Sequence, residues 1–336
     1  MTNENRNRAG RRRILIGLGT VAAVTGLGGA LWMRRATAER DRLVVADGRQ
    51  VSSALFYIAL TNGYFAEEGL DIDLQSHSFS RRAMEALMEG KADLAMSSEV
   101  PIMHALADGH ALKVVANIQT SDRDMAILAR RDRGISGADD LAGKTVGYIA
   151  RTNGHVFLDL FLAAHGLTGL VTAVAVKPED LVARLVAGTL DAVSSWTAIR
   201  LAAVPKLADT VTITAPTVYI ECWGVAVTTT VALRHRRALE RLMRGLLRAE
   251  RLAAEEPARA IASVATHLGQ SRDDIATLWP QYDFAVYLSQ TFLLNLENAA
   301  RSERRADADP SKVDYSRVFD TAALRSVDAR RVSLVQ

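Results

Sequence analysis

Two segments of this chain, 98 positions apart, share one pattern, and this repeat constrains the fold more than any other feature. Residues 84–98 read MEALMEGKADLAMSS and residues 182–196 read VARLVAGTLDAVSSW, which align without gaps. Each predicts a helix, a glycine cap and a buried strand that ends in serines. Any helix–glycine–strand unit looks similar, so coincidence is one interpretation. The other is that two related α/β units direct strand ends at a shared cleft, where open α/β sheets bind ligands.

Strands and helices alternate along the chain around this repeat. We expect strands at residues 43–46, 70–74, 93–96, 112–116, 125–129, 143–149, 171–176, 191–195, 211–214 and 224–228, with a mostly helical remainder. Such alternation predicts βαβ units and largely parallel sheets covered on both faces. Because the pattern restarts at Met125, we predict two lobes, residues 43–124 plus 224–336 and residues 125–223.

The first 38 residues have a different character. Residues 14–33 carry no charge, stand between arginines and are long enough to span a bilayer. The preceding GRRRILI resembles the twin-arginine export motif, although Gly10 and Ile16 depart from it, and residues 36–38 form an A-x-A cleavage site. We expect residues 1–38 to be an export signal or an uncleaved membrane anchor, with the remainder outside the cytoplasm. An ordinary buried helix is the alternative.

The basic character of the chain belongs to this leader. Seven arginines and one acid, Glu4, precede Glu39, and the remaining residues hold 34 basic and 37 acidic side chains. A nucleic-acid partner is therefore not expected. Cys222 is the only cysteine, and the seven histidines show no metal-ligand spacing. With no phosphate-binding loop and no nucleophile–base pair, we expect no cofactor, no metal and no catalytic residue.

Several motifs together resemble one family. They are LTNGYFAEEGLDIDL at residues 60–74, ALMEGKADLAMSSEVP at 86–101 and DDLAGKTVGY at 139–148. In this order and spacing they resemble the nitrate/taurine/sulfonate-type substrate-binding proteins of ABC importers, a family that also includes thiamine-pyrimidine binders. One departure is that Thr197, Ala198 and Ile199 follow Trp196 where the family often has proline.

The resemblance implies a fold and a function. The fold would be α/β, of the type II periplasmic-binding-protein kind, with hinge crossings near residues 121–125 and 219–224. The function would be capture of a small polar molecule by a periplasmic, monomeric protein that delivers it to an ABC permease and ATPase. A membrane-tethered ligand sensor is one alternative. An enzyme is another, because yeast-type pyrimidine synthases resemble the same family, but those carry a cysteine-rich iron site and this chain has Cys222 alone.

Polar and aromatic residues at strand ends and helix starts are the candidate ligand contacts. They are Ser52, Ser53, Ser98, Glu99, Thr152, Asn153, His155, Trp196 and Glu221. The serines can instead cap helices, and Trp196 can instead be a core residue. The helix start at Thr152 favours an anionic ligand, whereas Glu99 and Glu221 oppose one. The sequence leaves the ligand charge open and slightly favours a polar heteroaromatic or amine-bearing molecule.

Overall fold

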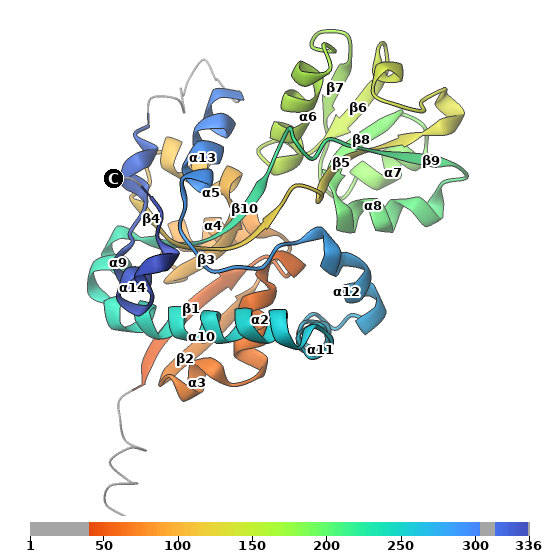
Figure 1. Ribbon diagram of the computed structural model, residues 1–336. Helices are drawn as coiled ribbons and strands as arrows, with labels where there is room; N and C mark the ends of the chain where they lie inside the picture. Colours follow the sequence, from red (N-terminus) through yellow and green to blue (C-terminus); the bar gives the residue numbers. More distant parts are fainter. Residues whose placement is uncertain (1–39, 303–312, 335–336) are drawn as a thin grey trace, which may run out of the picture. The chain divides into compact units, whose positions relative to one another are not determined.

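The computed structural model describes residues 40–302 and 313–334, which contain two five-stranded sheets (Figure 1). The first sheet holds β1 (Asp41–Asp47), β2 (Leu70–Ser76), β3 (Leu94–Ser98), β4 (Leu112–Ser121) and β10 (Glu221–Thr228). The second holds β5 (Met125–Arg130), β6 (Thr145–Tyr148), β7 (Thr172–Ala175), β8 (Ala192–Trp196) and β9 (Thr210–Thr214). The predicted leader, residues 1–38, lies outside the described residues.

The two sheets have the same strand arrangement. Their orders are β2-β1-β3-β10-β4 and β7-β6-β8-β5-β9. In each, three parallel strands are followed by one strand antiparallel to its neighbours, β10 in the first sheet and β5 in the second. The chain passes from the first sheet to the second between β4 and β5, and returns between β9 and β10. Both connections are close to where the sequence predicted hinge crossings.

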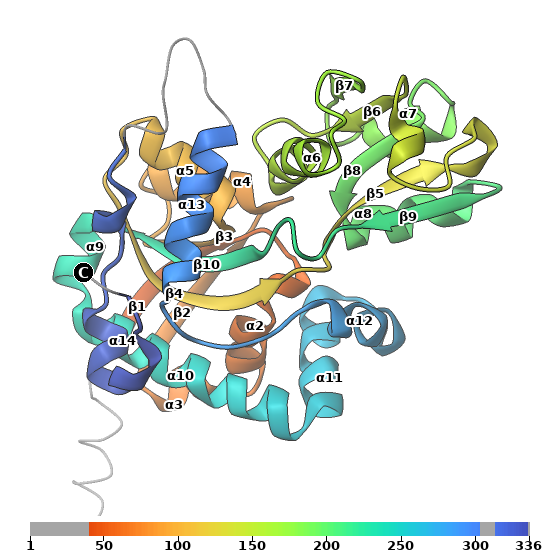
Figure 2. The same cartoon turned by 45° about the horizontal axis from the view of Figure 1, so that its top comes forward.

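Helices cover both faces of the first sheet (Figures 1 and 2). One layer contains α2 (Ala54–Thr61), α3 (Tyr64–Glu67), α10 (Arg236–Glu255) and α11 (Pro257–Leu268). The other contains α4 (Ser80–Met88), α5 (Glu99–Ala107) and α13 (Gln290–Ser302). Helix α10 buries Leu239, Leu242 and Leu246, which recur at helical spacing, while Arg236, Arg237 and Arg251 are exposed. The C-terminal half adds α9 (Thr229–Arg234), α12 (Arg272–Leu278) and α14 (Ala322–Val327).

The second sheet is also packed on two faces. Ile127 and Ala129 of β5 belong to the same apolar cluster as Phe157 of α6 (Asn153–Ala164). Leu128, between them, belongs to a second cluster with Leu185 of α7 (Leu181–Val186) and residues of α8 (Thr197–Ala203). Because neighbouring strand residues point to opposite faces, α6 covers one face and α7 with α8 covers the other.

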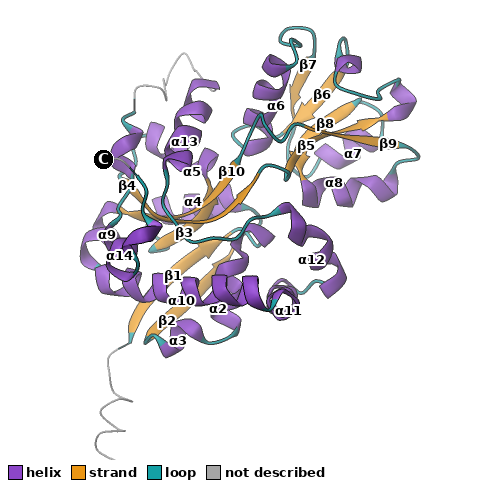
Figure 3. Ribbon diagram, viewed as in Figure 1, coloured by secondary structure: helices purple, strands orange, loops and turns teal. Residues whose placement is uncertain are grey.

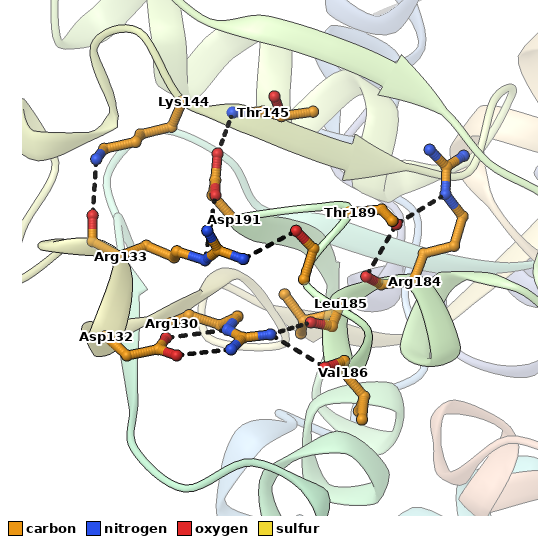
Figure 4. Close-up of polar contacts among 11 residues, drawn as sticks. Arg130, Asp132, Arg133, Lys144, Thr145, Arg184, Leu185, Val186, Thr189 and Asp191 are labelled. Carbon is orange, nitrogen blue, oxygen red and sulfur yellow. Dashed lines mark hydrogen bonds and ion pairs between the residues drawn. The ribbon is translucent and has the colours of Figure 1, made fainter.

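The sequence repeat is a structural repeat. Helices α4 and α7 each end before a glycine with positive φ, 71° at Gly90 and 74° at Gly188. Asp93 then makes two hydrogen bonds with Val44 of β1. Val44 N donates to Asp93 Oδ2 at 2.8 Å, and Asp93 N donates to Val44 O at 2.8 Å. Asp191 binds Thr145 of β6 in the same way, with both distances 2.9 Å (Figure 4).

Some element bounds differ from those predicted. Residues 54–65 hold two helices, α2 and the start of α3, which are divided at Gly63 because its φ of 74° does not fit a right-handed helix. Strand β10 starts at Glu221, before the expected residue 224, because Glu221 already pairs with Ser121 of β4. Figure 3 shows the alternation of strands and helices that the sequence predicted. Among the described residues, no helix has the length and apolar character needed to cross a membrane.

Candidate functional site

Residues from both sheets line a cavity of about 30 Å³. Its walls are formed by Gln50, Phe79, Ser80, Arg81, Ser98, Pro101, Asp124, Met125, Thr152, Asn153, Trp196, Glu221 and Trp223. Five of the nine predicted ligand contacts are in this set: Ser98, Thr152, Asn153, Trp196 and Glu221. The volume is close to that of one water molecule. A larger ligand therefore requires the walls to separate first, as in proteins that close around their ligands.

Two carboxyl groups meet at the points where the chain passes between the sheets. Asp124 lies just before β5, and Glu221 is the first residue of β10. Asp124 Oδ1 accepts hydrogen bonds from Thr197 N at 2.9 Å and from the Tyr282 hydroxyl at 3.2 Å. Burial, reinforced by the neighbouring charges of Asp124 and Glu99, raises the pKa of Glu221 well above its ordinary value. A Glu221 carboxyl that keeps its proton can donate a hydrogen bond to Asp124.

Glu221 has spare hydrogen-bonding capacity. Its Oε2 is buried and has no hydrogen-bond partner among the described residues, and its side chain lines the cavity. A buried carboxyl oxygen without a donor costs free energy. An N–H or O–H group of a ligand in the cavity would supply the missing donor.

Glu99, by contrast, is fully occupied by the protein. It is completely buried and accepts hydrogen bonds from Asn153 Nδ2 at 3.0 Å, from Cys222 N at 2.9 Å and from the Tyr219 hydroxyl. Burial raises the pKa of Glu99 to about 8. The Glu99 side chain is not part of the cavity wall. It instead holds Asn153, which is part of that wall.

Asn153 joins the two sheet units across the cavity. It is the first residue of α6, and its Oδ1 accepts a hydrogen bond from Ser98 Oγ at 2.6 Å. Its Nδ2 also donates to the Tyr219 hydroxyl at 2.5 Å. Thr152, immediately before it, donates its hydroxyl to Ile149 O at 2.7 Å.

The other predicted contacts lie away from the cavity. Ser52 and Ser53 are buried in the short helix after β1, and Ser53 binds the far side of the Trp223 indole. His155 stacks on Tyr148, with ring centroids 4.4 Å apart. None of these three side chains is part of the cavity wall.

The sequence did not single out the cavity residues contributed by the start of α4. Phe79, Ser80 and Arg81 belong to an ordinary polar helix start, with no motif to mark them. They reach the cavity because Gly48 packs against them, so closely that a Cβ on Gly48 would lie 2.5 Å from Ser80 N. This approach is tertiary, and a single sequence does not reveal it. No cluster of His, Cys, Asp and Glu suited to a metal ion occurs among residues 40–302 and 313–334.

Known proteins share parts of the sequence and the fold. A formylaminopyrimidine-binding protein from Halalkalibacterium halodurans is 33% identical over 93 residues, which are 27% of this chain and 28% of that protein. A 4-amino-5-hydroxymethyl-2-methylpyrimidine phosphate synthase from Saccharomyces cerevisiae is 27% identical over 128 residues, 38% of this chain and 34% of the synthase. Both matches thus span about a third or less of these relatives.

Similarity in structure extends over most of the chain. The alkanesulfonate-binding protein SsuA from Xanthomonas axonopodis pv. citri superposes with a TM-score of 0.70 at 18% identity, covering 85% of this chain and 100% of that protein. This confirms the predicted α/β fold of the periplasmic-binding-protein kind. The family model described as NMT1/THI5 like matches residues 50–260, more than half of the sequence. The resemblance seen in the motifs is therefore confirmed, and the chain belongs to the NMT1/THI5-like family.

Proposed function

We propose that this chain is an extracytoplasmic solute-binding protein that holds a small, flat heterocycle with N–H donors, such as an aminopyrimidine. The observation that carries the proposal is the unpartnered, buried carboxyl of Glu221 in a cavity lined by both sheet units. An exocyclic amine or ring N–H would donate to this carboxyl, and the Trp196 ring would stack on the heterocycle.

Electrostatics favour this ligand over a sulfonate or nitrate. The cavity wall includes two acidic residues, Asp124 and Glu221, and one basic residue, Arg81. Arg81 Nε already lies 3.7 Å from Glu85 Oε1 on the same helix, and its side chain is 36% exposed. A negative ligand would have to approach both acidic residues of this wall. A neutral N–H donor avoids this repulsion.

Isothermal titration calorimetry tests the ligand class. We expect 4-amino-5-hydroxymethyl-2-methylpyrimidine to bind the wild-type chain, with MOPS and nitrate as anionic comparisons. Glu221→Leu should weaken pyrimidine binding about 10- to 100-fold, because it removes the acceptor. Glu221→Gln should retain most of the affinity, since an amide resembles the protonated carboxyl. Asp122→Asn is the matched control, because Asp122 is a nearby, partly exposed acid that does not line the cavity. Binding of MOPS but not the pyrimidine would refute this ligand class.

We further propose that the protein delivers its ligand to an ABC permease and ATPase. The fold shared with an alkanesulfonate-binding protein and the similarity to a formylaminopyrimidine-binding protein support this role. Deleting the gene should abolish uptake of the radiolabelled pyrimidine by intact cells, and re-expression should restore it. Unchanged uptake would refute delivery while leaving binding intact.

The N-terminal sequence supports export by the twin-arginine route, followed by cleavage or retention as an anchor. Replacing Arg11, Arg12 and Arg13 with lysine should keep the protein in the cytoplasmic fraction. The same fractionation shows whether mature protein is released or membrane-bound. Normal export of the lysine variant would exclude the twin-arginine route.

The similarity to a yeast synthase favours an enzyme as the second candidate. The cavity wall, however, offers Glu221 Oε2 as an acceptor for a bound donor, which is a feature that binding requires. Incubation of purified protein with the same pyrimidine, followed by mass spectrometry, should return the pyrimidine unchanged. A product with a new mass would support the enzyme.

A further inference from the structure

A buried series of hydrogen bonds leads from the cavity wall to the end of β1 in the first sheet unit. Trp223 of β10 lines the cavity and is 2% exposed. Its Nε1 donates to Ser53 Oγ at 2.9 Å, and Ser53 Oγ donates to Asp47 Oδ1 at 2.6 Å. Asp47 is the last residue of β1 and is completely buried. These hydrogen bonds therefore connect β10 with the end of β1 and the short helix after it, and Trp223 and Ser53 are 170 residues apart in the sequence.

The direction of every bond in this series is fixed by chemistry. An indole nitrogen can only donate, so Ser53 must accept from Trp223. The single hydroxyl proton of Ser53 is then directed to Asp47. If Asp47 did not accept it, this proton would be free to point elsewhere, and the oxygen lone pair that faces the indole would no longer be held in place.

Asp47 is itself held from several sides. Its Oδ2 accepts from the Tyr57 hydroxyl and from Arg49 N, the latter at 2.8 Å. The Tyr57 ring stacks on His267 of α11, with centroids 4.3 Å apart. Burial raises the pKa of Asp47, and the hydrogen bonds from Ser53 and Tyr57 act in the opposite direction. Three donors on one buried side chain make it a rigid anchor.

We propose that Asp47 is a positioning residue, which orients the Ser53 hydroxyl and through it fixes the Trp223 ring in the wall of the ligand cavity. Asp47 and Ser53 do not line the cavity themselves. The effect on ligand affinity rests on the proposed function, whereas the effect on the Trp223 ring does not. The two can therefore be measured separately.

The first measurement needs no ligand. In the ¹⁵N-labelled full chain, the indole ¹H–¹⁵N signal of Trp223 is assigned by its loss in Trp223→Phe. We expect this signal to move upfield and to exchange faster with water in Ser53→Ala, because the acceptor is removed. Asp47→Asn should have a similar effect, since one amide oxygen cannot replace two carboxylate oxygens that both accept. Tyr57→Phe is the matched control: it removes a donor to the same carboxylate but leaves the path to Trp223 intact.

The second measurement uses 4-amino-5-hydroxymethyl-2-methylpyrimidine as the probe. Ser53→Ala and Asp47→Asn should each weaken its binding about tenfold, the equivalent of one ordered hydrogen bond. Tyr57→Phe should change affinity less than threefold. In a Trp223→Phe background, Ser53→Ala should have no further effect on affinity, because the ring that it positions no longer has an indole N–H.

Three results would overturn the proposal. They are an unmoved Trp223 signal in Ser53→Ala, an equal shift in Tyr57→Phe, and an undiminished effect of Ser53→Ala in the Trp223→Phe background. If the probe binds no variant, wild type included, the proposed ligand class fails, and the Trp223 signal alone decides whether Asp47 positions the ring.

Discussion

The two sheet units, each a five-stranded sheet with the helices that cover it, are built alike at their strand ends. They contribute different side chains to the cavity. In the first, Ser98 at the end of β3 pairs with Trp223 of the antiparallel strand β10. In the second, Trp196 at the end of β8 pairs with Met125 of the antiparallel strand β5. Each unit thus places one tryptophan at the same level of its sheet, but on opposite members of the strand pair.

The acidic pair follows the same symmetry. Asp124 comes just before β5, and Glu221 begins β10, so each carboxyl stands where the chain enters a sheet. The frameworks agree because Asp93 and Asp191 bind β1 and β6 identically. The walls differ because the strand ends carry different residues: Ser98 in the first sheet corresponds to Trp196 in the second.

The largest difference in stability between the two units should appear at Glu99 and Thr197. These are the matched positions that directly follow the two repeated segments. Glu99→Ala would leave the Tyr219 hydroxyl and Cys222 N without an acceptor and would remove one of the two acceptors of Asn153 Nδ2. It should lower the free energy of unfolding by about 3 kcal/mol. Thr197→Ala, at the corresponding position, should cost about 1 kcal/mol. Urea denaturation measures both. Equal losses would mean that the two strand ends are not specialised.

The Trp196 side chain should contribute more to ligand affinity than to the stability of the fold. Trp196→Ala should weaken binding of 4-amino-5-hydroxymethyl-2-methylpyrimidine by about 30-fold, the equivalent of about 2 kcal/mol of base–aromatic stacking. Trp279→Ala is the control, because Trp279 packs on Phe284, with ring centroids 4.5 Å apart, and does not line the cavity. Comparable losses of affinity in both variants, measured by calorimetry, would remove Trp196 from the site.

Because Asp93 and Asp191 make the same hydrogen bonds to a neighbouring strand, replacing either should have the same effect on stability. Asp93→Ala and Asp191→Ala each remove one acceptor from a backbone N–H of a neighbouring strand. Each should lower stability by about 1–2 kcal/mol. Thermal and urea unfolding of the two variants should agree within about 0.5 kcal/mol. A much larger loss at one site would show that the repeat is not equivalent in energy.

A pH dependence of stability is also expected from the first unit, because Glu99 is buried there. Burial raises the pKa of Glu99 to about 8 from its ordinary value of 4.5. Between these values the folded state keeps a proton that the unfolded state releases, so Glu99 reduces stability as pH rises from about 5 to 8. The slope is at most about 1.4 kcal/mol per pH unit. Glu99→Gln should flatten it in urea titrations repeated across this range, and an unchanged slope would assign it to other groups.

The sequence predicted those features that depend on local pattern. Glycine caps, alternating strands and helices, and the repeat gave the α/β fold. Ser98, Asn153, Trp196 and Glu221 lie at ends of elements, which parallel topology brings together. Glu99 is also at such an end, but its carboxyl accepts a hydrogen bond from Cys222 N of β10 and is not part of the cavity wall.

What the sequence could not supply depends on contacts between segments far apart. Phe79 and Arg81 enter the wall through the close approach of Gly48 to α4. Ser53 was predicted as a ligand contact, but its hydroxyl lies between Trp223 and Asp47. Neither arrangement follows from propensity or spacing. The first depends on how the residue after β1 meets the start of α4, and the second on how Trp223 of β10 reaches Ser53.

The most direct test of a ligand site shared by two differently specialised units is a crystal structure of the full chain with 4-amino-5-hydroxymethyl-2-methylpyrimidine. We predict that the ring stacks on Trp196 and that its amine lies within hydrogen-bond distance of the Glu221 carboxyl. The cavity should be wider than the about 30 Å³ of the present structure. A ligand bound elsewhere, or held by only one unit, would contradict this account.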